Sequence, residues 1–140
     1  MKRKILFLIC ILLCELYTQA QIPTRLEFLS VCDSLGIQHK NVVWAQARLE
    51  SGNFKSGTYR TKKNCLGIYD SRKKQYAWFK DWKDCLVAYK DRVQKKRGNV
   101  VESDEQYISW LISMGYAADT AYGTKIKQIM SSDKKKKRNR

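Results

Sequence analysis

Hydrophobic residues at helical spacing divide most of the chain into predicted helices. Thr24 and Glu27 form a capping box at the start of the first helix, and Gly36 marks its end. The hydrophobic face of this helix consists of Leu26, Leu29 and Leu35. A second helix is predicted from residue 41 to residue 51, and its hydrophobic positions are Val43, Trp44, Ala47 and Leu49. Glu50 therefore falls in the last turn of the second helix.

The central part of the chain predicts a surface loop followed by a small hairpin. Residues 53–63 are polar and lack helical periodicity, which is typical of a loop. Residues 66–69 and 75–79 are two short aliphatic or aromatic runs on either side of a polar segment, Asp70 to Lys74. This pattern indicates two short strands joined by a turn.

Three further helices are predicted in the second half of the chain. One runs from Asp81 to about Lys96, and another opens with a capping box at Ser103 to Gln106 and stops at Gly115. The last begins near Thr120. Their expected buried positions are Trp82, Leu86, Tyr89 and Val93, then Tyr107, Trp110, Leu111 and Met114, and finally Tyr122, Ile126 and Ile129. The fold class is therefore mainly α, with about five helices and a small β-hairpin.

The first 20 residues have the pattern of a secretory signal peptide. Three basic residues precede an apolar run over residues 5–13, and the segment ends at Ala20. The run is shorter than the roughly 20 apolar residues of a membrane-spanning helix, although an uncleaved anchor is the alternative. We expect an exported protein, periplasmic or extracellular, with no transmembrane segment after cleavage. Residues 21–133 would form one domain, expected to be a monomer, and residues 134–140 a basic disordered tail.

The cysteines that remain after cleavage are Cys32, Cys65 and Cys85. Export permits a disulfide, but three pairings are possible and the sequence does not choose among them. There is no CxxC motif, and the single histidine, His39, lies in a short polar connection where we expect it to be solvated. We therefore predict no metal site and no cofactor.

The balance of charge favours anionic partners. The chain carries a formal net charge of +15, and without the predicted signal it has 25 basic and 12 acidic side chains, a net charge of +13. For an exported protein the available polyanions are acidic glycans, peptidoglycan stems and anionic lipid headgroups. The basic residues 134–140 are expected to hold the protein near such envelope surfaces. A nucleic-acid partner is not expected, because no recognised reading motif is present.

Glu50 is the strongest candidate for chemistry. A negative charge at the C-terminal end of a helix is unfavourable, so the carboxyl group is expected to hold its proton more firmly than usual. That direction suits a general acid working near neutral pH. The alternative is an ordinary ion pair with Arg48 or Arg60.

Several short motifs in a fixed order resemble one known family. The chain carries LESG, NCLGI, an aromatic hairpin and GYAAD, followed by a tyrosine and a Lys-Ile pair. These segments are Leu49 to Gly52, Asn64 to Ile68, the hairpin ending at Phe79, Gly115 to Asp119, Tyr122 and Lys125-Ile126. Together they resemble the glucosaminidase domain of glycoside hydrolase family 73, especially its short secreted versions from Bacteroidetes, over about residues 25–130. The family's usual forms, NLFGI and GYATD, differ here at Cys65, Leu66 and Ala118.

The resemblance implies a lysozyme-like α-lobe and a specific activity. The family is expected to cleave the bond between N-acetylglucosamine and N-acetylmuramic acid in the glycan strands of peptidoglycan. By position, Glu50 would be the general acid and Tyr116 would line the reaction centre as a second catalytic residue. The residues expected to bind substrate are Asn64, Gly67, Tyr76, Trp78 and Asp119. Some relatives carry labels for glycoprotein N-glycans or amidase activity, which are alternative substrates.

Three of these residues also have a purely structural interpretation. Asn64 could bond to the backbone at the hairpin entrance, Tyr116 could be a packed aromatic, and Asp119 could cap the last helix. Trp44, Trp82 and Trp110 are expected in the core, whereas Tyr76 and Trp78 are expected to face the glycan.

A second catalytic carboxylate is not evident. Most glycosidases use two carboxyl groups, about 5 Å apart in retaining enzymes and about 6.5–9.5 Å apart in inverting ones. The hairpin contains no glutamate, and the nearest candidates are Asp70 and Asp81. Three solutions stay open: one of these aspartates holds the water, the N-acetyl group of the substrate assists, or Tyr116 helps to position a nucleophile. The rival hypothesis is a catalytically silent peptidoglycan-binding module.

Overall fold

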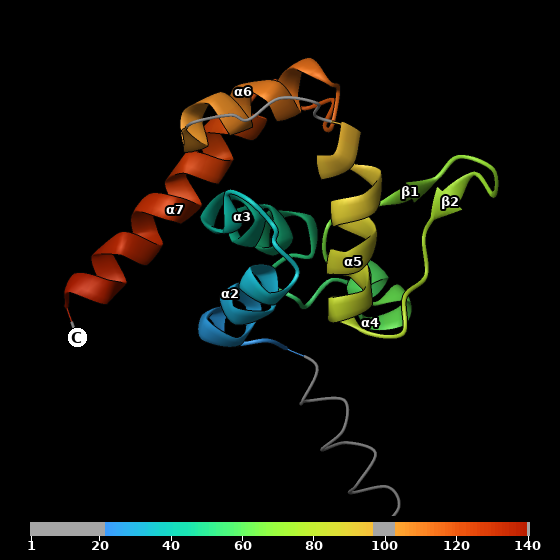
Figure 1. Ribbon diagram of the computed structural model, residues 1–140, viewed down its shortest axis with the longest axis horizontal. Helices are drawn as coiled ribbons and strands as arrows, with labels where there is room; N and C mark the ends of the chain where they lie inside the picture. Colours follow the sequence, from blue (N-terminus) through green and yellow to red (C-terminus); the bar gives the residue numbers. More distant parts are fainter. Residues whose placement is uncertain (1–21, 97–102, 140) are drawn as a thin grey trace, which may run out of the picture.

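The computed structural model describes residues 22–96 and 103–139, so the predicted signal peptide lies outside it. In chain order the elements are α2 (Arg25–Ser34), α3 (Lys40–Glu50), α4 (Gly57–Lys62), β1 (Tyr69–Asp70), β2 (Gln75–Tyr76), α5 (Trp82–Arg92), η1 (Gln94–Lys96), α6 (Asp104–Ser113) and α7 (Tyr122–Arg138). The mainly helical fold with one antiparallel hairpin is confirmed (Figure 1). No helix within these described ranges combines the length and apolar character needed to cross a membrane.

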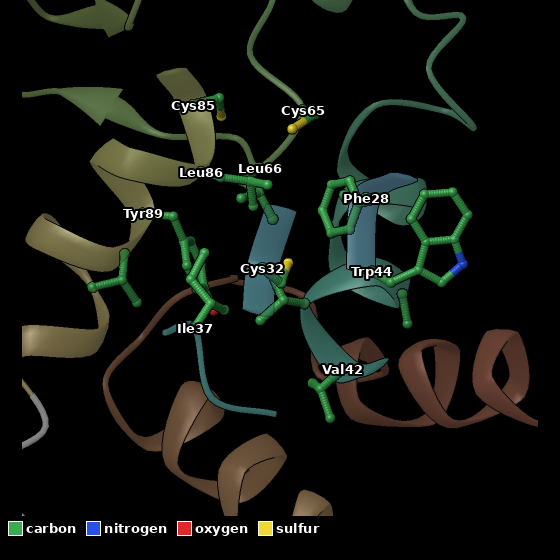
Figure 2. Packing of buried hydrophobic residues seen from close by; sticks show 14 of the residues in the cluster. Phe28, Cys32, Ile37, Val42, Trp44, Cys65, Leu66, Cys85, Leu86 and Tyr89 are labelled. Atoms are coloured by element: carbon green, nitrogen blue, oxygen red, sulfur yellow. The ribbon is translucent and has the colours of Figure 1, made fainter. Parts of the chain in front are cut away.

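Helix α3 is the centre of the molecule. Six consecutive residues, Val42 to Ala47, are buried, and the helix contacts α2, α6 and α7. Its Trp44 ring packs edge-on against Phe28 of α2 at 5.0 Å (Figure 2). Phe28 also stacks on Trp82 of α5 at 5.6 Å. A helix covered on nearly every side has a rigid end, and Glu50 is the last residue of α3.

The first helix buries a different face from the predicted one. The capping box at Thr24 is confirmed, and two residues of the predicted face, Leu29 and Leu35, pack partly buried against the core. The third, Leu26, is 81% exposed, and the fully buried residues are Phe28 and Cys32. These two residues are four apart, so they share one face of the helix. The larger aromatic surface of Phe28 turns this face, and not the one that contains Leu26, toward α3.

Residues 57–62 form α4, where the sequence predicted a loop. Ser56 caps this helix by accepting a hydrogen bond from the backbone of Tyr59, and Lys63 ends it in a left-handed conformation. Tyr59 is buried and packs at 5.3 Å against Phe54. One anchoring aromatic and a capping serine are sufficient for a short helix but leave no periodic pattern to detect.

The basic C-terminal segment is also helical where the sequence predicted a disordered tail. Helix α7 continues to Arg138, and its last turn contains Lys135 to Arg138. Asp133 fixes the preceding turn, because its carboxylate accepts hydrogen bonds from Arg48 at 2.6 Å and from the Trp44 indole at 2.9 Å. Lysine and arginine are good helix formers and are favourable at a helix C-terminus.

The hairpin is confirmed, with shorter strands than the sequence suggested. Tyr69 pairs with Tyr76 and Asp70 with Gln75. Figure 1 shows the hairpin projecting from the helices on the side opposite the C-terminal end of α7. After the hairpin, Asp81 caps α5 by accepting hydrogen bonds from two backbone groups. The second predicted capping box is also confirmed, and it opens α6 at Ser103.

Candidate active site

Glu50 stands at the junction between α3 and a tight turn. Ser51 is buried, and its hydroxyl donates to the Ala47 carbonyl at 2.5 Å and accepts from the Phe54 backbone at 2.8 Å. The serine therefore fixes the chain directly after Glu50. The Glu50 side chain is partly exposed, so the carboxyl group is held by the fold and is still within reach of a ligand.

Gly67 brings the second motif against this carboxyl group. Its φ is +62°, and a Cβ built on it would lie 2.7 Å from Glu50 Oε2. Any side chain at this position would collide with the carboxylate and would also be strained, because positive φ favours glycine. The structure thus brings together Glu50 and Gly67, two residues that the sequence assigned to the site.

The loop that carries Gly67 is held from both sides. On one side, Asn64 is 2% exposed and donates to the Ile68 and Ala77 carbonyls at 2.8 and 3.1 Å. The Asn64 carbonyl oxygen accepts from the Ile68 backbone at 2.9 Å. The amide is occupied by the hairpin entrance, so its observed contacts match the structural interpretation of Asn64 and not the predicted substrate contact.

Tyr116 holds the other side of the same loop. Its hydroxyl donates to the carbonyl of Leu66, next to Gly67, and its ring lies 6.1 Å from the ring of Tyr122. Glu50 lies close enough for its charge to raise the pKa of Tyr116, although burial is the larger cause. Tyr116 therefore lies near Glu50 with its proton committed to the loop backbone, and its role in the reaction stays a prediction.

Burial raises the pKa of Glu50, and a hydrogen bond from the Tyr122 hydroxyl partly opposes this effect. The direction agrees with the sequence-based expectation, and the largest cause is desolvation of the carboxyl group. The alternative ion pair with Arg48 or Arg60 does not form: within residues 22–96 and 103–139 no ion pair includes Glu50, and Arg48 pairs with Asp133. Glu50 is thus poised to be protonated more readily than an ordinary glutamate.

The two candidate second carboxylates each perform a local backbone task. Asp70 accepts hydrogen bonds from Arg72 and Lys73 in the hairpin turn, and these bonds lower its pKa. Asp81 caps α5 through the backbone groups of Lys83 and Asp84. Neither residue is among the causes of the raised pKa of Glu50. A catalytic role for Asp70 or Asp81 stays a prediction.

Asp119 supports the turn that leads into α7. Its carboxylate accepts from the Ala121 backbone at 2.8 Å and pairs with Lys125 at 2.5 Å, and both contacts lower its pKa. The expectation that Asp119 caps the last helix is wrong, because the N-cap residue of α7 is Ala121 and no side-chain hydrogen bond caps it. Because Asp119 is exposed, its contact with substrate also stays a prediction.

Three aromatic side chains lie exposed on the hairpin. Tyr76 and Trp78 are 47% and 62% exposed, and Tyr69 joins them with its ring 5.9 Å from that of Tyr76. That Tyr76 and Trp78 face a glycan stays a prediction. The ammonium of Lys62 lies 5.4 Å from the centre of the Trp78 ring. Exposed rings of this kind are suited to stacking on sugar faces. The core assignment of Trp44 and Trp82 is correct, and Trp110 is partly buried against the core.

Sequence reasoning missed two residues next to Glu50. Tyr122 was placed in the core by its spacing, but its hydroxyl also bonds to Glu50. Gln46 is completely buried and donates to Tyr122 at 3.1 Å. The available signals were that Gln46 lies one turn before Glu50 on the same helix face, and that Tyr122 belongs to the ordered motifs described above.

The remaining candidates for metal or redox chemistry do not assemble into a metal site. No group of three or more potential ligands occurs in the described part of the chain. Cys32, Cys65 and Cys85 are buried free thiols. His39 is not the solvated residue expected, because its ring stacks on Tyr107 at 4.7 Å and its Nδ1 lies 2.9 Å from Asp104.

Comparison with known proteins gives a match to a family model. The model of the glucosaminidase family, described as mannosyl-glycoprotein endo-beta-N-acetylglucosaminidase, matches residues 27–135. No curated protein and no solved structure matches the chain. The matched range contains Glu50, the Gly67 loop, the hairpin and both tyrosines beside the carboxyl group.

Proposed function

The chain belongs to the glucosaminidase family, a family of glycosidases, and on this basis we propose that it hydrolyses the β-1,4 bond after N-acetylglucosamine in peptidoglycan. Glu50 is the general acid. The observation that carries this proposal is a partly buried carboxyl group with a raised pKa, held at the end of the central helix. Such a group can be protonated at a pH where an exposed glutamate is ionised.

The first chemical step uses the proton of Glu50. The neutral carboxyl group gives this proton to the oxygen of the glycosidic bond, and the bond between that oxygen and C1 of N-acetylglucosamine breaks. Positive charge develops on the sugar ring while Glu50 becomes a carboxylate. The hydrogen bond from Tyr122 stabilises the carboxylate at that moment, because a donor favours the charged form of an acid.

In the second step a water molecule adds to C1, and a carboxylate takes up the proton that the water loses. The local roles of Asp70 and Asp81 favour the solution in which the carbonyl oxygen of the substrate's N-acetyl group bonds to C1 as the leaving oxygen departs. The incoming water then attacks C1, and the bond between C1 and the N-acetyl oxygen breaks. Glu50 then accepts a proton from the incoming water, which regenerates the acid. This route needs one protein carboxyl group and therefore agrees with a hairpin that lacks a glutamate.

The hairpin and α7 supply complementary contacts with the envelope. Tyr69, Tyr76 and Trp78 present exposed rings for sugar stacking. The basic end of α7 lies on the opposite side of the molecule and is suited to anionic groups of the wall or membrane (Figure 1). A net charge of +13 after the predicted signal peptide favours peptidoglycan over neutral glycoprotein glycans.

The proposal is tested by digesting purified peptidoglycan with the mature protein and with Glu50→Gln. Products are reduced with borohydride and identified by mass spectrometry. We expect reduced N-acetylglucosamine ends from the wild type and a loss of roughly 100- to 10,000-fold in the variant, the usual contribution of a general acid. Glu105→Gln, an exposed glutamate of α6, is the matched control and should keep full activity.

Two further variants separate the routes for the second step. Asp70→Asn and Asp81→Asn keep the side-chain oxygen that accepts the local backbone hydrogen bonds, and they remove only the negative charge. We expect each to keep more than about a tenth of wild-type activity, whereas a loss as large as that of Glu50→Gln would identify a second catalytic carboxylate. If the wild type releases no fragments and both it and Glu50→Gln pellet with the wall, the protein is a binding module and the catalytic proposal fails.

A further inference from the structure

A line of hydrogen-bonded side chains connects Glu50 with the far side of the helical core. It begins with the bond from the Tyr122 hydroxyl to Glu50. The following links are Gln46 to Tyr122 at 3.1 Å, Tyr89 to Gln46 at 2.6 Å, Tyr89 with Tyr107 at 2.7 Å, and Gln94 to Tyr107 at 3.0 Å. The line crosses α7, α3, α5 and α6 and ends at η1.

The inner members of this line are sealed from water. Gln46, Tyr89 and Tyr107 have no exposed surface, and Tyr122 is 3% exposed. Buried polar groups without partners are costly, so each donor in the line must be directed at an acceptor. The hydrogen-bond pattern is therefore constrained by the protein and not by solvent.

Two contacts set the direction of the protons in this line: a backbone contact at Gln94 and the bond from Tyr89 to Gln46. The Gln38 N–H can only donate, and it donates to the side-chain oxygen of Gln94 at 3.1 Å. The Gln94 nitrogen then faces the Gln38 carbonyl and the Tyr107 oxygen. Because the single hydroxyl proton of Tyr89 goes to the Gln46 oxygen, Tyr107 must be the donor to Tyr89.

The same logic fixes the end of the line at the active site. With its oxygen facing Tyr89, the Gln46 amide presents its nitrogen to Tyr122. The Tyr122 oxygen accepts this bond, and its own proton is left for Glu50. An amide turned the other way would offer Tyr122 an oxygen and draw the proton away from the carboxyl group.

We propose that Gln46 is a positioning residue that directs the Tyr122 proton at Glu50, and that the Tyr107–Tyr89 pair fixes the Gln46 amide in the orientation required. This inference rests on the proposed role of Glu50 as the acid. The line does not transfer protons during the reaction. It holds one donor in place, and each bond in such a chain strengthens the next by polarisation.

The expected consequence is that two opposing effects together set the pKa of Glu50. Burial raises the pKa of Glu50, and the Tyr122 bond lowers it. The titratable side chains that face Glu50 are Tyr122 of α7 and Tyr116 of the preceding loop, and burial raises the pKa of both, so they stay neutral over the working range. A weaker Tyr122 bond would raise the pKa of Glu50 and move the alkaline limit of kcat/KM to higher pH.

The test measures the pKa of Glu50 directly by NMR of the labelled side-chain carboxyl carbon. We expect Tyr122→Phe to raise this pKa by about one, and Gln46→Met to raise it in the same direction by less. In the double variant, Gln46→Met should add nothing to the effect of Tyr122→Phe, because Gln46 acts through that hydroxyl. Gln128→Met, an exposed position on α7, is the matched control and should leave the pKa unchanged.

Two results would overturn the proposal: an unchanged pKa in Gln46→Met, or an effect of Gln46→Met that adds fully to that of Tyr122→Phe. If Gln46→Met does not fold, Tyr89→Phe takes its place, since it keeps Gln46 and removes only the hydroxyl that orients its amide. We expect Tyr89→Phe to raise the pKa of Glu50, and no change would overturn the proposal. The readout does not depend on turnover, so a protein that binds but does not cleave peptidoglycan would refute the proposed function and leave this test intact.

Discussion

The properties of Glu50 are set by neighbours that differ in kind. Burial favours its neutral form, the Tyr122 hydroxyl favours its charged form, and Gly67 leaves the space that its carboxylate fills. Burial and the Tyr122 hydroxyl change how firmly Glu50 holds its proton, whereas Gly67 determines where the carboxylate can lie. The site therefore depends on the absence of a side chain at Gly67 as well as on the burial of Glu50 and its bond with Tyr122.

Replacing this glycine should remove activity with little loss of fold elsewhere. In Gly67→Ala the new methyl group would lie 2.7 Å from Glu50 Oε2, and the backbone would be strained at its φ of +62°. We expect at least a tenfold loss of kcat. The free energy of unfolding should fall by roughly 1–3 kcal/mol, which would lower the melting temperature. Peptidoglycan turnover and thermal denaturation would measure both.

Gly57→Ala is the matched control for this substitution. A Cβ at Gly57, the first residue of α4, meets no atom within 4 Å, and no strained φ is involved. We expect unchanged turnover and a small gain in stability of about 0.5–1 kcal/mol. Equal losses in the two variants would mean that the contact between Gly67 and Glu50 is not what matters.

At the scale of elements, the loop after α4 is where local structures meet. Asn64 ties it to the hairpin, Tyr116 ties it to the segment before α7, and Cys65 faces α5. Figure 2 shows Cys65 beside Cys85, whereas Cys32 lies apart on α2. The Cys65 and Cys85 thiols are hydrogen-bonded to each other, and burial raises the pKa of Cys65 well above its usual value.

These positions predict one disulfide among the three that the sequence left open. Refolding the reduced chain with oxidised glutathione should join Cys65 to Cys85, with release of two molecules of reduced glutathione, and leave Cys32 as a thiol. The folded, reduced protein should react slowly, because its buried thiols resist forming the thiolate that attacks. The bridge should add about 3 kcal/mol of stability.

Peptide mapping under non-reducing conditions would identify the bridge. Cys32→Ala is the matched control and should keep the linked peptides, whereas Cys85→Ala should lose them. A bridge that includes Cys32 would contradict the arrangement of the three thiols described above.

At the scale of the whole molecule, the hairpin, which carries the exposed aromatic residues, and the basic end of α7 lie on opposite sides (Figure 1). Asp133 makes this geometry fixed, since it binds Arg48 and Trp44 of α3 and holds α7 against the core. The lysines that follow are exposed and face solvent. In the proposed function, wall attachment and sugar contact would therefore use separate surfaces.

Removing charge from the end of α7 should weaken attachment without changing the chemistry. In the triple variant Lys134→Gln, Lys136→Gln and Lys137→Gln we expect severalfold weaker pelleting with peptidoglycan at low salt. When the salt concentration is raised, the variant should lose less binding than the wild type does. Hydrolysis of a short, uncharged glycan fragment should be unchanged. The readouts are sedimentation at two ionic strengths and turnover of the fragment.

An equal loss of charge elsewhere provides the control. Arg92→Gln, Lys95→Gln and Lys96→Gln alter exposed residues of α5 and η1. If this variant binds the wall as weakly as the α7 variant does, total charge and not the position of the basic helix governs attachment.

The sequence by itself determined the elements that depend on neighbouring residues. The capping boxes at Thr24 and Ser103, the end of α3 at Glu50 and the hairpin between residues 66 and 79 all follow from local patterns. The motifs that resemble the glucosaminidase family were also visible in the chain, and the family match confirmed them.

Tertiary contacts decided the rest, because they join residues far apart in the chain. Helix α4 depends on the burial of Tyr59, and the last turns of α7 follow an aspartate held by α3. The approach of Gly67 to Glu50, the bond from Tyr122 and the buried line behind Gln46 have no local signal. Spacing along one helix can show which residues share a face, but only packing shows which side chains from other elements meet them there.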